Sequence, residues 1–177
     1  LKLHQAGRLT EAATLYEKLH RAQPKNAQLL HVFGTLRLQT GRPHDAVALL
    51  DQSVKLDPAN AWAYSNRGVA LKQLRRLDEA LACFENANRI NSESAMVVSN
   101  IGAVAELRGQ YREALNRYKQ AREMMPDSSS ILARVLHVSQ HQCEWDGIDQ
   151  LFKETIRLVR EGKFEGVNPF SLITVPG

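Results

Sequence analysis

One sequence feature constrains the fold more than any other, because the same residue types return every 34 positions. Alanine recurs at this spacing, each time after an acidic residue, at Ala12, Ala46, Ala80 and Ala114. Large apolar residues and glycines follow the same period, at Tyr16, Leu50, Phe84 and Tyr118, and at Gly34, Gly68 and Gly102. A fixed period of this length indicates an array of structural repeats in which each repeat packs on its neighbours.

Within one period, apolar and small residues follow two helical stripes separated by a short turn. The first stripe includes Tyr64 and Gly68, and the second includes Ala80 and Phe84. Gly68 and Ala80 lack bulk where two antiparallel helices must approach closely, whereas the aromatic side chains fill the wider gaps. Residues suited to cap the next helix are expected at Asn26, Asn60, Ser94 and Ser128. The repeating unit is therefore a helix, a turn and a second helix.

This pattern of a small residue, an alanine, an aromatic residue and a proline resembles the tetratricopeptide repeat across residues 7–128. The resemblance implies an all-α fold, a right-handed superhelical solenoid of antiparallel helix pairs with a concave groove. In the last unit Leu136 and Ile148 stand where the period expects Gly and Ala. We expect a partial repeat at 1–26, complete repeats at 27–60, 61–94 and 95–128, a degenerate repeat or cap at 129–162, and a linker towards a missing C-terminal domain at 163–177.

Composition and charge restrict the classes of function. The chain has 177 residues, of which 44% are hydrophobic and 24% charged, and this excludes a disordered or fibrous chain. Its 23 basic and 19 acidic residues are interleaved, so we expect no nucleic-acid partner. The apolar runs fall far short of the ~20 residues that a membrane span needs, so no membrane partner is expected. Cys83 and Cys143 form no CxxC pair, so a reducing, cytoplasmic compartment is predicted.

The sequence contains no phosphate-cradling glycine loop, no HExxH and no GxSxG motif. We therefore expect this chain alone to have no catalytic residue, no cofactor and no metal. His137, His141 and Cys143 have a spacing that zinc ligands can have, but no fourth ligand is evident nearby, so packing is the preferred interpretation. Cys83 lies on the apolar stripe of its helix, where a buried, inert thiol is expected.

Binding residues are expected on the first helix of each repeat, which lines the concave groove. A projection at about 100° per residue places on that side the candidate peptide-binding residues His31, Trp62, Asn66, Gln73 and Asn100. The same side also receives Gln28, Thr35, Gln39, Val69, Met96 and Ala103. Asn66 and Asn100 could hold a peptide main chain, because a carboxamide offers a donor and an acceptor together. The alternative is that they are ordinary solvent-facing polar residues.

A second resemblance concerns the C-terminal part of the chain, where Cys143, Trp145 and Asp146 are followed by Pro169 and Phe170. This order resembles the junction between repeats and catalytic domain in the O-GlcNAc transferase and SPINDLY-like family of protein glycosyltransferases. The repeats of that family carry an asparagine ladder for the substrate peptide, which matches the paired asparagines of the expected groove.

This second resemblance implies a repeat arm that recruits acceptor proteins for a nucleotide-sugar-dependent protein O-glycosyltransferase. The catalytic domain would then lie outside this chain. The alternative is a free-standing adaptor or scaffold that mediates protein–protein interaction, and a repeat arm attached to another enzyme is a third possibility. Each of these needs a protein or peptide in the concave groove, and a homo-oligomer is left open.

Overall fold

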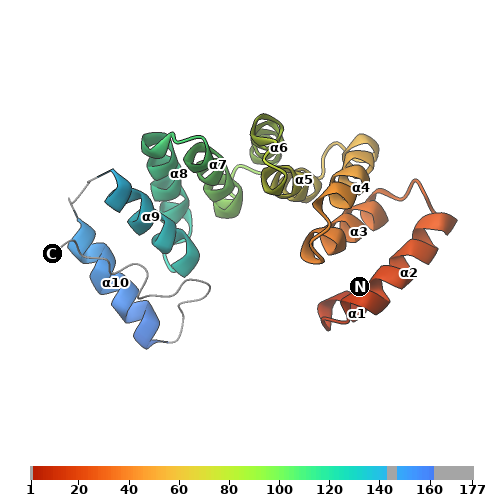
Figure 1. Ribbon diagram of the computed structural model, residues 1–177, viewed down its shortest axis with the longest axis horizontal. Coiled ribbons are helices and arrows are strands. Elements are labelled where there is room, and N and C mark those ends of the chain that lie inside the picture. The colour runs from red at the N-terminus through yellow and green to blue at the C-terminus, as the bar shows by residue number, and fades with distance from the viewer. Residues whose placement is uncertain (1, 143–146, 162–177) are drawn as a thin grey trace. The chain divides into compact units, whose positions relative to one another are not determined.

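The computed structural model describes residues 2–142 and 147–161, which form helices and no strand (Figure 1). The helices are α1 (Lys2–Gln5), α2 (Leu9–Ala22), α3 (Ala27–Gln39), α4 (Pro43–Leu56), α5 (Ala61–Gln73), α6 (Leu77–Ile90), α7 (Ala95–Leu107), α8 (Tyr111–Met124), α9 (Ser129–His141) and α10 (Ile148–Arg160). The chain divides into two compact units, Leu1–Ser92 with α1 to α6 and Glu93–Gly177 with α7 to α10.

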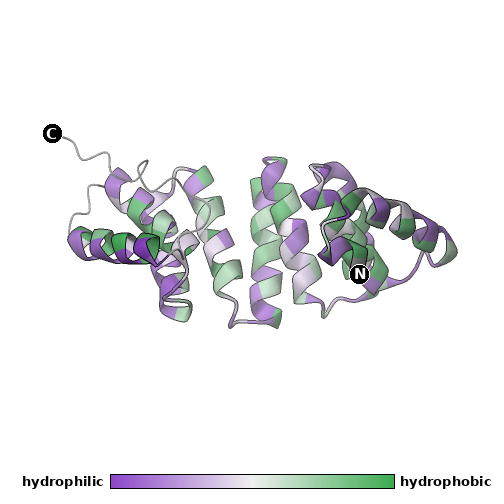
Figure 2. Ribbon diagram, turned by 90° about the horizontal axis from the view of Figure 1, so that it is seen from below, coloured by the Kyte–Doolittle hydropathy of each residue, from purple (hydrophilic) through white to green (hydrophobic). Residues whose placement is uncertain are grey.

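Consecutive helices pack as pairs within each unit. In the first unit α3 packs on α4 and α5 on α6, and in the second α7 packs on α8 and α9 on α10. Neighbouring pairs inside a unit also touch, through α4 and α5 and through α8 and α9. Each helix carries hydrophilic and hydrophobic residues side by side, and these pairings bury the hydrophobic ones (Figure 2). The predicted fold class, a solenoid of helix pairs, is confirmed.

The predicted N-caps are also confirmed. The capping side chain accepts a hydrogen bond from the backbone N–H three residues further on, at 3.0 Å for Asn26, 3.0 Å for Asn60, 3.4 Å for Ser94 and 3.5 Å for Ser128. These bonds satisfy one of the free N–H groups at the start of α3, α5, α7 and α9. The first helix of each of these pairs therefore begins where the local sequence predicts.

Three periodic glycines determine how closely the two helices of a pair approach. Each faces a large side chain on the second helix, and a Cβ there would lie less than 3.0 Å from it: 2.7 Å for Gly34 and Leu50, 2.7 Å for Gly68 and Phe84, and 2.9 Å for Gly102 and Tyr118. Real Cβ atoms do not approach that closely, so with any larger residue the facing side chain or the helices would have to shift. The expected reason for a small residue at Gly68 is confirmed.

The turn inside a helix pair uses a left-handed backbone conformation. Gly41 and Gly109 have φ angles of 70° and 75°, which glycine adopts at little cost. Arg75 occupies the same place in the period and has φ 61° although it carries a side chain. Such a conformation is uncommon for residues other than glycine, asparagine and aspartate. The turn geometry is thus kept even where the periodic glycine is missing.

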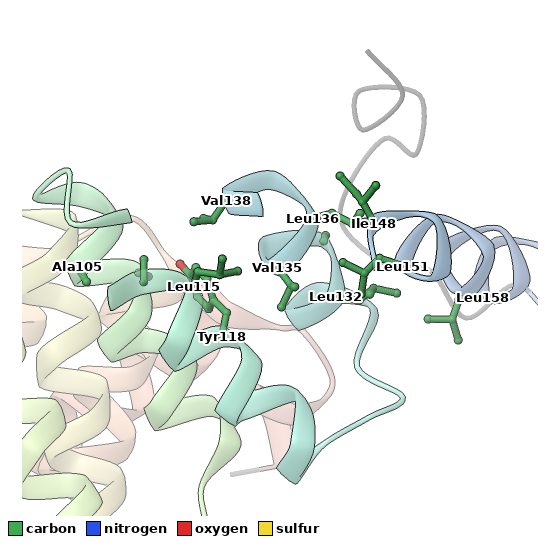
Figure 3. Close-up of a cluster of buried hydrophobic side chains, with 13 residues drawn as sticks. Ala105, Leu115, Tyr118, Leu132, Val135, Leu136, Val138, Ile148, Leu151 and Leu158 are labelled. Atoms are coloured by element: carbon green, nitrogen blue, oxygen red, sulfur yellow. The ribbon is translucent and has the colours of Figure 1, made fainter. Parts of the chain in front are cut away.

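Each unit has its own apolar core. In the second unit, side chains from α7, α8, α9 and α10 form one cluster that includes Tyr118, Leu132 and Leu158 (Figure 3). Leu136 and Ile148 belong to this cluster, so the two departures from the period fill the core with larger side chains. Among the residues that the structure describes, no helix is long and apolar enough to cross a bilayer.

Candidate functional site

The first unit places the predicted binding residues of α3 and α5 on two helices that touch. Trp62 is 67% exposed, which is unusual for so large an apolar side chain. Asn66 lies one turn further along α5 and is half-buried, while Gln73 is exposed at the end of the helix. An exposed indole beside a partly buried amide combines apolar contact area with a polar group that can orient a ligand.

The side chain of Asn66 is held by α3. Its Nδ2 donates to Thr35 Oγ1 over 2.9 Å and lies 3.2 Å from His31 Nε2. Thr35 donates its own hydroxyl proton to the carbonyl oxygen of His31, so Thr35 Oγ1 can only accept from Asn66. The contacts with Thr35 and His31 use both N–H donors of the amide. They leave the carbonyl oxygen Oδ1 of Asn66 as the group that a ligand could use.

This network corrects one part of the sequence interpretation. We expected the amide of Asn66 to offer a donor and an acceptor to a peptide backbone, but both of its N–H groups donate to Thr35 and His31. Helix spacing could not show this, because the partners belong to a different helix. His31 therefore acts in this unit by orienting Asn66, and its own exposure to a ligand is only partial.

His31 must be neutral in this arrangement. Its Nε2 accepts from the Asn66 amide, so the ring proton is on Nδ1, which is buried without a hydrogen-bond partner among the described residues. Burial lowers the pKa of His31 below its ordinary value of 6.5. If Nε2 of His31 were protonated, it would become a donor and could no longer accept the hydrogen bond from the Asn66 amide N–H.

We expect the stability of the chain to fall as the pH drops below 6.5, in part through His31. The unfolded chain binds a proton at this residue before the folded chain does, so acid favours unfolding. The His31→Gln variant should show a shallower loss of unfolding free energy between neutral and mildly acidic pH, measured by urea unfolding. His44→Gln is the matched control, because His44 is an exposed histidine of the same unit. An equal change of slope in both variants would contradict the assignment.

The second unit contains the remaining predicted positions. Asn100 on α7 is half-buried and takes part in interactions of its own, and Met96 is 52% exposed one turn before it. Ala103 is wrongly placed by the helix projection, because it is buried in the core of the unit. Asn66 and Asn100 belong to different units, so a ladder formed by both amides stays a prediction.

Sequence reasoning missed a network of polar side chains that joins α7, α8 and α9. Tyr118 on α8 donates its hydroxyl to Glu106 Oε2 over 2.5 Å, and Arg134 Nη1 donates to the same Tyr118 oxygen over 3.1 Å. His137 Nε2 lies 3.6 Å from Glu106 Oε1. Burial, followed by the bond to Glu106, raises the pKa of Tyr118, so this hydroxyl stays protonated. The signal in the sequence was the spacing of Arg134 and His137, which share a helix face.

Neither the histidines that the sequence spaces like zinc ligands nor the Cys83 thiol lies in surroundings that favour metal binding or nucleophilic chemistry. His141 stacks on Tyr111 with ring centroids 5.4 Å apart, and no cluster of three ligand-type side chains occurs among the described residues. Cys143 lies outside the described residues. Cys83 is buried, and burial raises the pKa of its thiol although Arg67 donates to its sulfur over 3.1 Å. A thiol of this kind is a weak nucleophile.

The fold and these surfaces define a helical repeat protein whose exposed features suit contact with other macromolecules. The sequence of residues 59–127 matches the protein-family model of the tetratricopeptide repeat. Residues 5–87 match the protein-family model of anaphase-promoting complex, cyclosome, subunit 3. Residues 59–127 therefore carry tetratricopeptide repeats, and the helix pairs of the described residues have the fold of that family. No curated protein matches the sequence.

Solved structures share the fold at low sequence identity. A crystal structure of MamA is 22% identical with a TM-score of 0.80, and the alignment covers 91% of this chain and 94% of that one. PilF of Pseudomonas aeruginosa is 18% identical with a TM-score of 0.80, covering 95% and 74% of the two chains. A thermophilic tetratricopeptide-repeat protein of Thermus thermophilus is 21% identical with a TM-score of 0.74, covering 90% and 88%. At these identities the likeness shows the fold alone.

None of these matches names a glycosyltransferase. The junction expected around Cys143, Trp145 and Asp146, and the expected linker at 163–177, lie outside the described residues. The tetratricopeptide resemblance is therefore confirmed, whereas the resemblance to O-GlcNAc transferase gains no support from the comparisons.

Proposed function

We propose that the chain is an adaptor or scaffold that binds a protein or peptide through the first helices of its repeats. Tetratricopeptide repeats are typically protein-interaction modules, which supports this class of function. The observation that carries the proposal is the pairing of an exposed Trp62 with an Asn66 amide that α3 holds in one orientation. A pre-oriented polar group beside an exposed aromatic side chain lowers the entropy lost on binding. Gln73 would extend the contact along α5, and Asn100 would offer a contact of its own in the second unit.

The repeat boundaries belong to this proposal. Helix pairs that begin at Ala27, Ala61, Ala95 and Ser129 support units at 27–60, 61–94, 95–128 and 129–162. The cytoplasmic location and the lack of a cofactor stay predictions. So does a homo-oligomer, in which a second copy of the chain would be the protein partner.

The test measures binding of a panel of unrelated peptides to the whole chain, with Trp62→Ala, Asn66→Ala and parent side by side. We expect Trp62→Ala to weaken some peptides about fivefold or more, because exposed aromatic anchors carry side-chain recognition. Asn66→Ala should weaken all peptides by a similar factor of about 3–10, since one hydrogen bond contributes roughly 0.5–1.5 kcal/mol. Leu56→Ala, which shortens another exposed apolar side chain of the first unit, is the matched control.

Circular dichroism must show that Asn66→Ala keeps its helices, because that amide also bonds to α3. If both variants bind the panel as the parent does, the proposed site is wrong. If Asn66→Ala affects a single peptide, the amide recognises a side chain and the main-chain role is wrong.

The finer possibility is that this adaptor is the acceptor-recruiting arm of a protein O-glycosyltransferase. It is supported by two features of the sequence: the order of Cys143, Trp145, Asp146, Pro169 and Phe170, and the pair of asparagines Asn66 and Asn100. Determining the coding sequence that follows Gly177 in the gene tests it directly. A nucleotide-sugar-binding domain there would favour the arm, and its absence would leave the adaptor.

A further inference from the structure

Three nitrogen-bearing side chains share one face of α9 in the second unit. Arg134, His137 and His141 follow the spacing i, i+3 and i+7, which aligns them along a helix. The side chain of Arg134 is 45% exposed and that of His137 is 51% exposed, and His141 is also exposed. The face is therefore accessible to a ligand within its own unit.

These side chains are held in place by aromatic rings. The guanidinium carbon of Arg134 lies 5.6 Å from the centroid of the Tyr118 ring, and its Nη1 also donates to the Tyr118 hydroxyl. His141 stacks on Tyr111, and the rings of His137 and His141 meet edge to face at 4.7 Å. Side chains ordered before binding lose less rotamer entropy when a partner arrives.

One carboxylate, Glu106 on α7, faces this group and is shared among its members. It accepts the Tyr118 hydroxyl at 2.5 Å, while Arg134 and His137 reach it only at 3.8 and 3.6 Å. Charge-assisted hydrogen bonds are shorter, at about 2.7–2.9 Å. The positive charge of Arg134 is thus incompletely neutralised, and a guanidinium has five N–H donors of which the bond to Tyr118 uses one.

We propose that this face of α9 binds an acidic segment of a partner protein through the carboxylates of that segment. The proposal rests on the proposed protein-binding function and names the chemistry of one ligand. Arg134 supplies the permanent charge and N–H donors, because a guanidinium stays protonated and its planar fork matches a carboxylate. His137 supplies a ring N–H in either protonation state. Glu106, behind them, orients Arg134 and Tyr118 and repels a ligand carboxylate that approaches too deeply.

The test uses fluorescein-labelled peptides of alternating Glu and Gly with an amidated C-terminus, and the matching peptides of Gln and Gly, with the whole chain. Fluorescence anisotropy should show tighter binding of the Glu peptide and a loss of affinity as salt is added. Arg134→Gln should weaken the Glu peptide on the order of tenfold, since hydrogen bonds to charged groups contribute more than neutral ones. Arg117→Gln removes the same charge from a similarly exposed arginine that faces Glu113, and it should change affinity by less than about twofold.

A Glu–Gly peptide with a free C-terminus separates the two sources of carboxylate. If the peptide with the free C-terminus binds more tightly than the amidated one, the face binds the carboxylate of a chain terminus. If both bind equally, the face binds side-chain carboxylates. Either result supports the proposal. Equal affinity for the Glu and Gln peptides, or equal losses in Arg134→Gln and Arg117→Gln, would overturn it while leaving the adaptor function intact. Binding of a labelled thymidine oligonucleotide in place of the Glu peptide would also overturn it. If no peptide of any composition binds, the proposed function itself fails.

His137→Gln provides a second variant, which keeps a side-chain N–H donor but removes the ring. Circular dichroism of both variants should match the parent, because neither side chain lies in the core. A loss of affinity with unchanged helix content assigns the effect to binding. A loss that appears only together with a loss of helix content would contradict the direct role.

Discussion

Replacing Phe84 by alanine should lower the unfolding free energy by about 3–5 kcal/mol, the range found when a buried aromatic side chain is removed from a core. Phe84 is fully buried on α6 and packs against Gly68 on α5. Glycine has no side chain that could move into the space, so the cavity cannot close from that side. For a chain of this size the melting temperature should fall by roughly 6–20 °C.

Urea unfolding followed by circular dichroism measures this effect. Ile90→Ala on the same helix is the control, because it also removes a large apolar side chain but one that is 37% exposed. Its loss of unfolding free energy should be less than half that of Phe84→Ala. Similar losses in the two variants would mean that Phe84 does not occupy the tight contact between α5 and α6.

The second large effect is expected at Gly68, where valine should destabilise the chain by about 1–3 kcal/mol through overpacking. An added Cβ would lie 2.7, 2.8 and 2.9 Å from three atoms of the Phe84 ring, and a packed ring cannot bend away as a flexible side chain does. The gain in helix propensity on replacing glycine is below about 1 kcal/mol and does not offset this clash. Gln73→Val on the same helix places the branched side chain on an exposed position and should cost little.

The two substitutions should not be additive. In the double variant Gly68→Val/Phe84→Ala, the valine methyl groups can enter the space that the ring vacates. We expect the double variant to be more stable than the sum of the single effects by about 0.5–3 kcal/mol, the range found for residues in contact. Additivity within about 0.5 kcal/mol would refute the direct contact of these two positions.

Much of the fold follows from local sequence. Asn60 predicts the start of α5 because its side chain can bond to an N–H three residues away, and this needs no tertiary contact. The 34-residue period places Gly68 opposite Phe84 because helix length and turn length are constant within the repeat. The turn at Arg75 keeps the left-handed geometry that glycine predicts elsewhere.

The candidate sites depend on contacts between helices, and these are not readable from spacing along one helix. The period singles out Asn66 on α5, but only the approach of α3 shows that Thr35 and His31 occupy its N–H donors. In the same way, the position of Arg134 on α9 does not show that its guanidinium bonds to the Tyr118 hydroxyl on α8.

The sequence by itself determined the helix pairs, their caps and the positions that must stay small. Each of these depends on hydrogen bonds or volumes within one repeat. The tertiary structure decided which polar atoms are engaged and which remain for a ligand. Glu106, Tyr118 and Arg134 come from three different helices, and their distances depend on how those helices pack. A side-chain hydrogen bond forms or fails over a few tenths of an ångström, and a residue pattern does not specify position that finely.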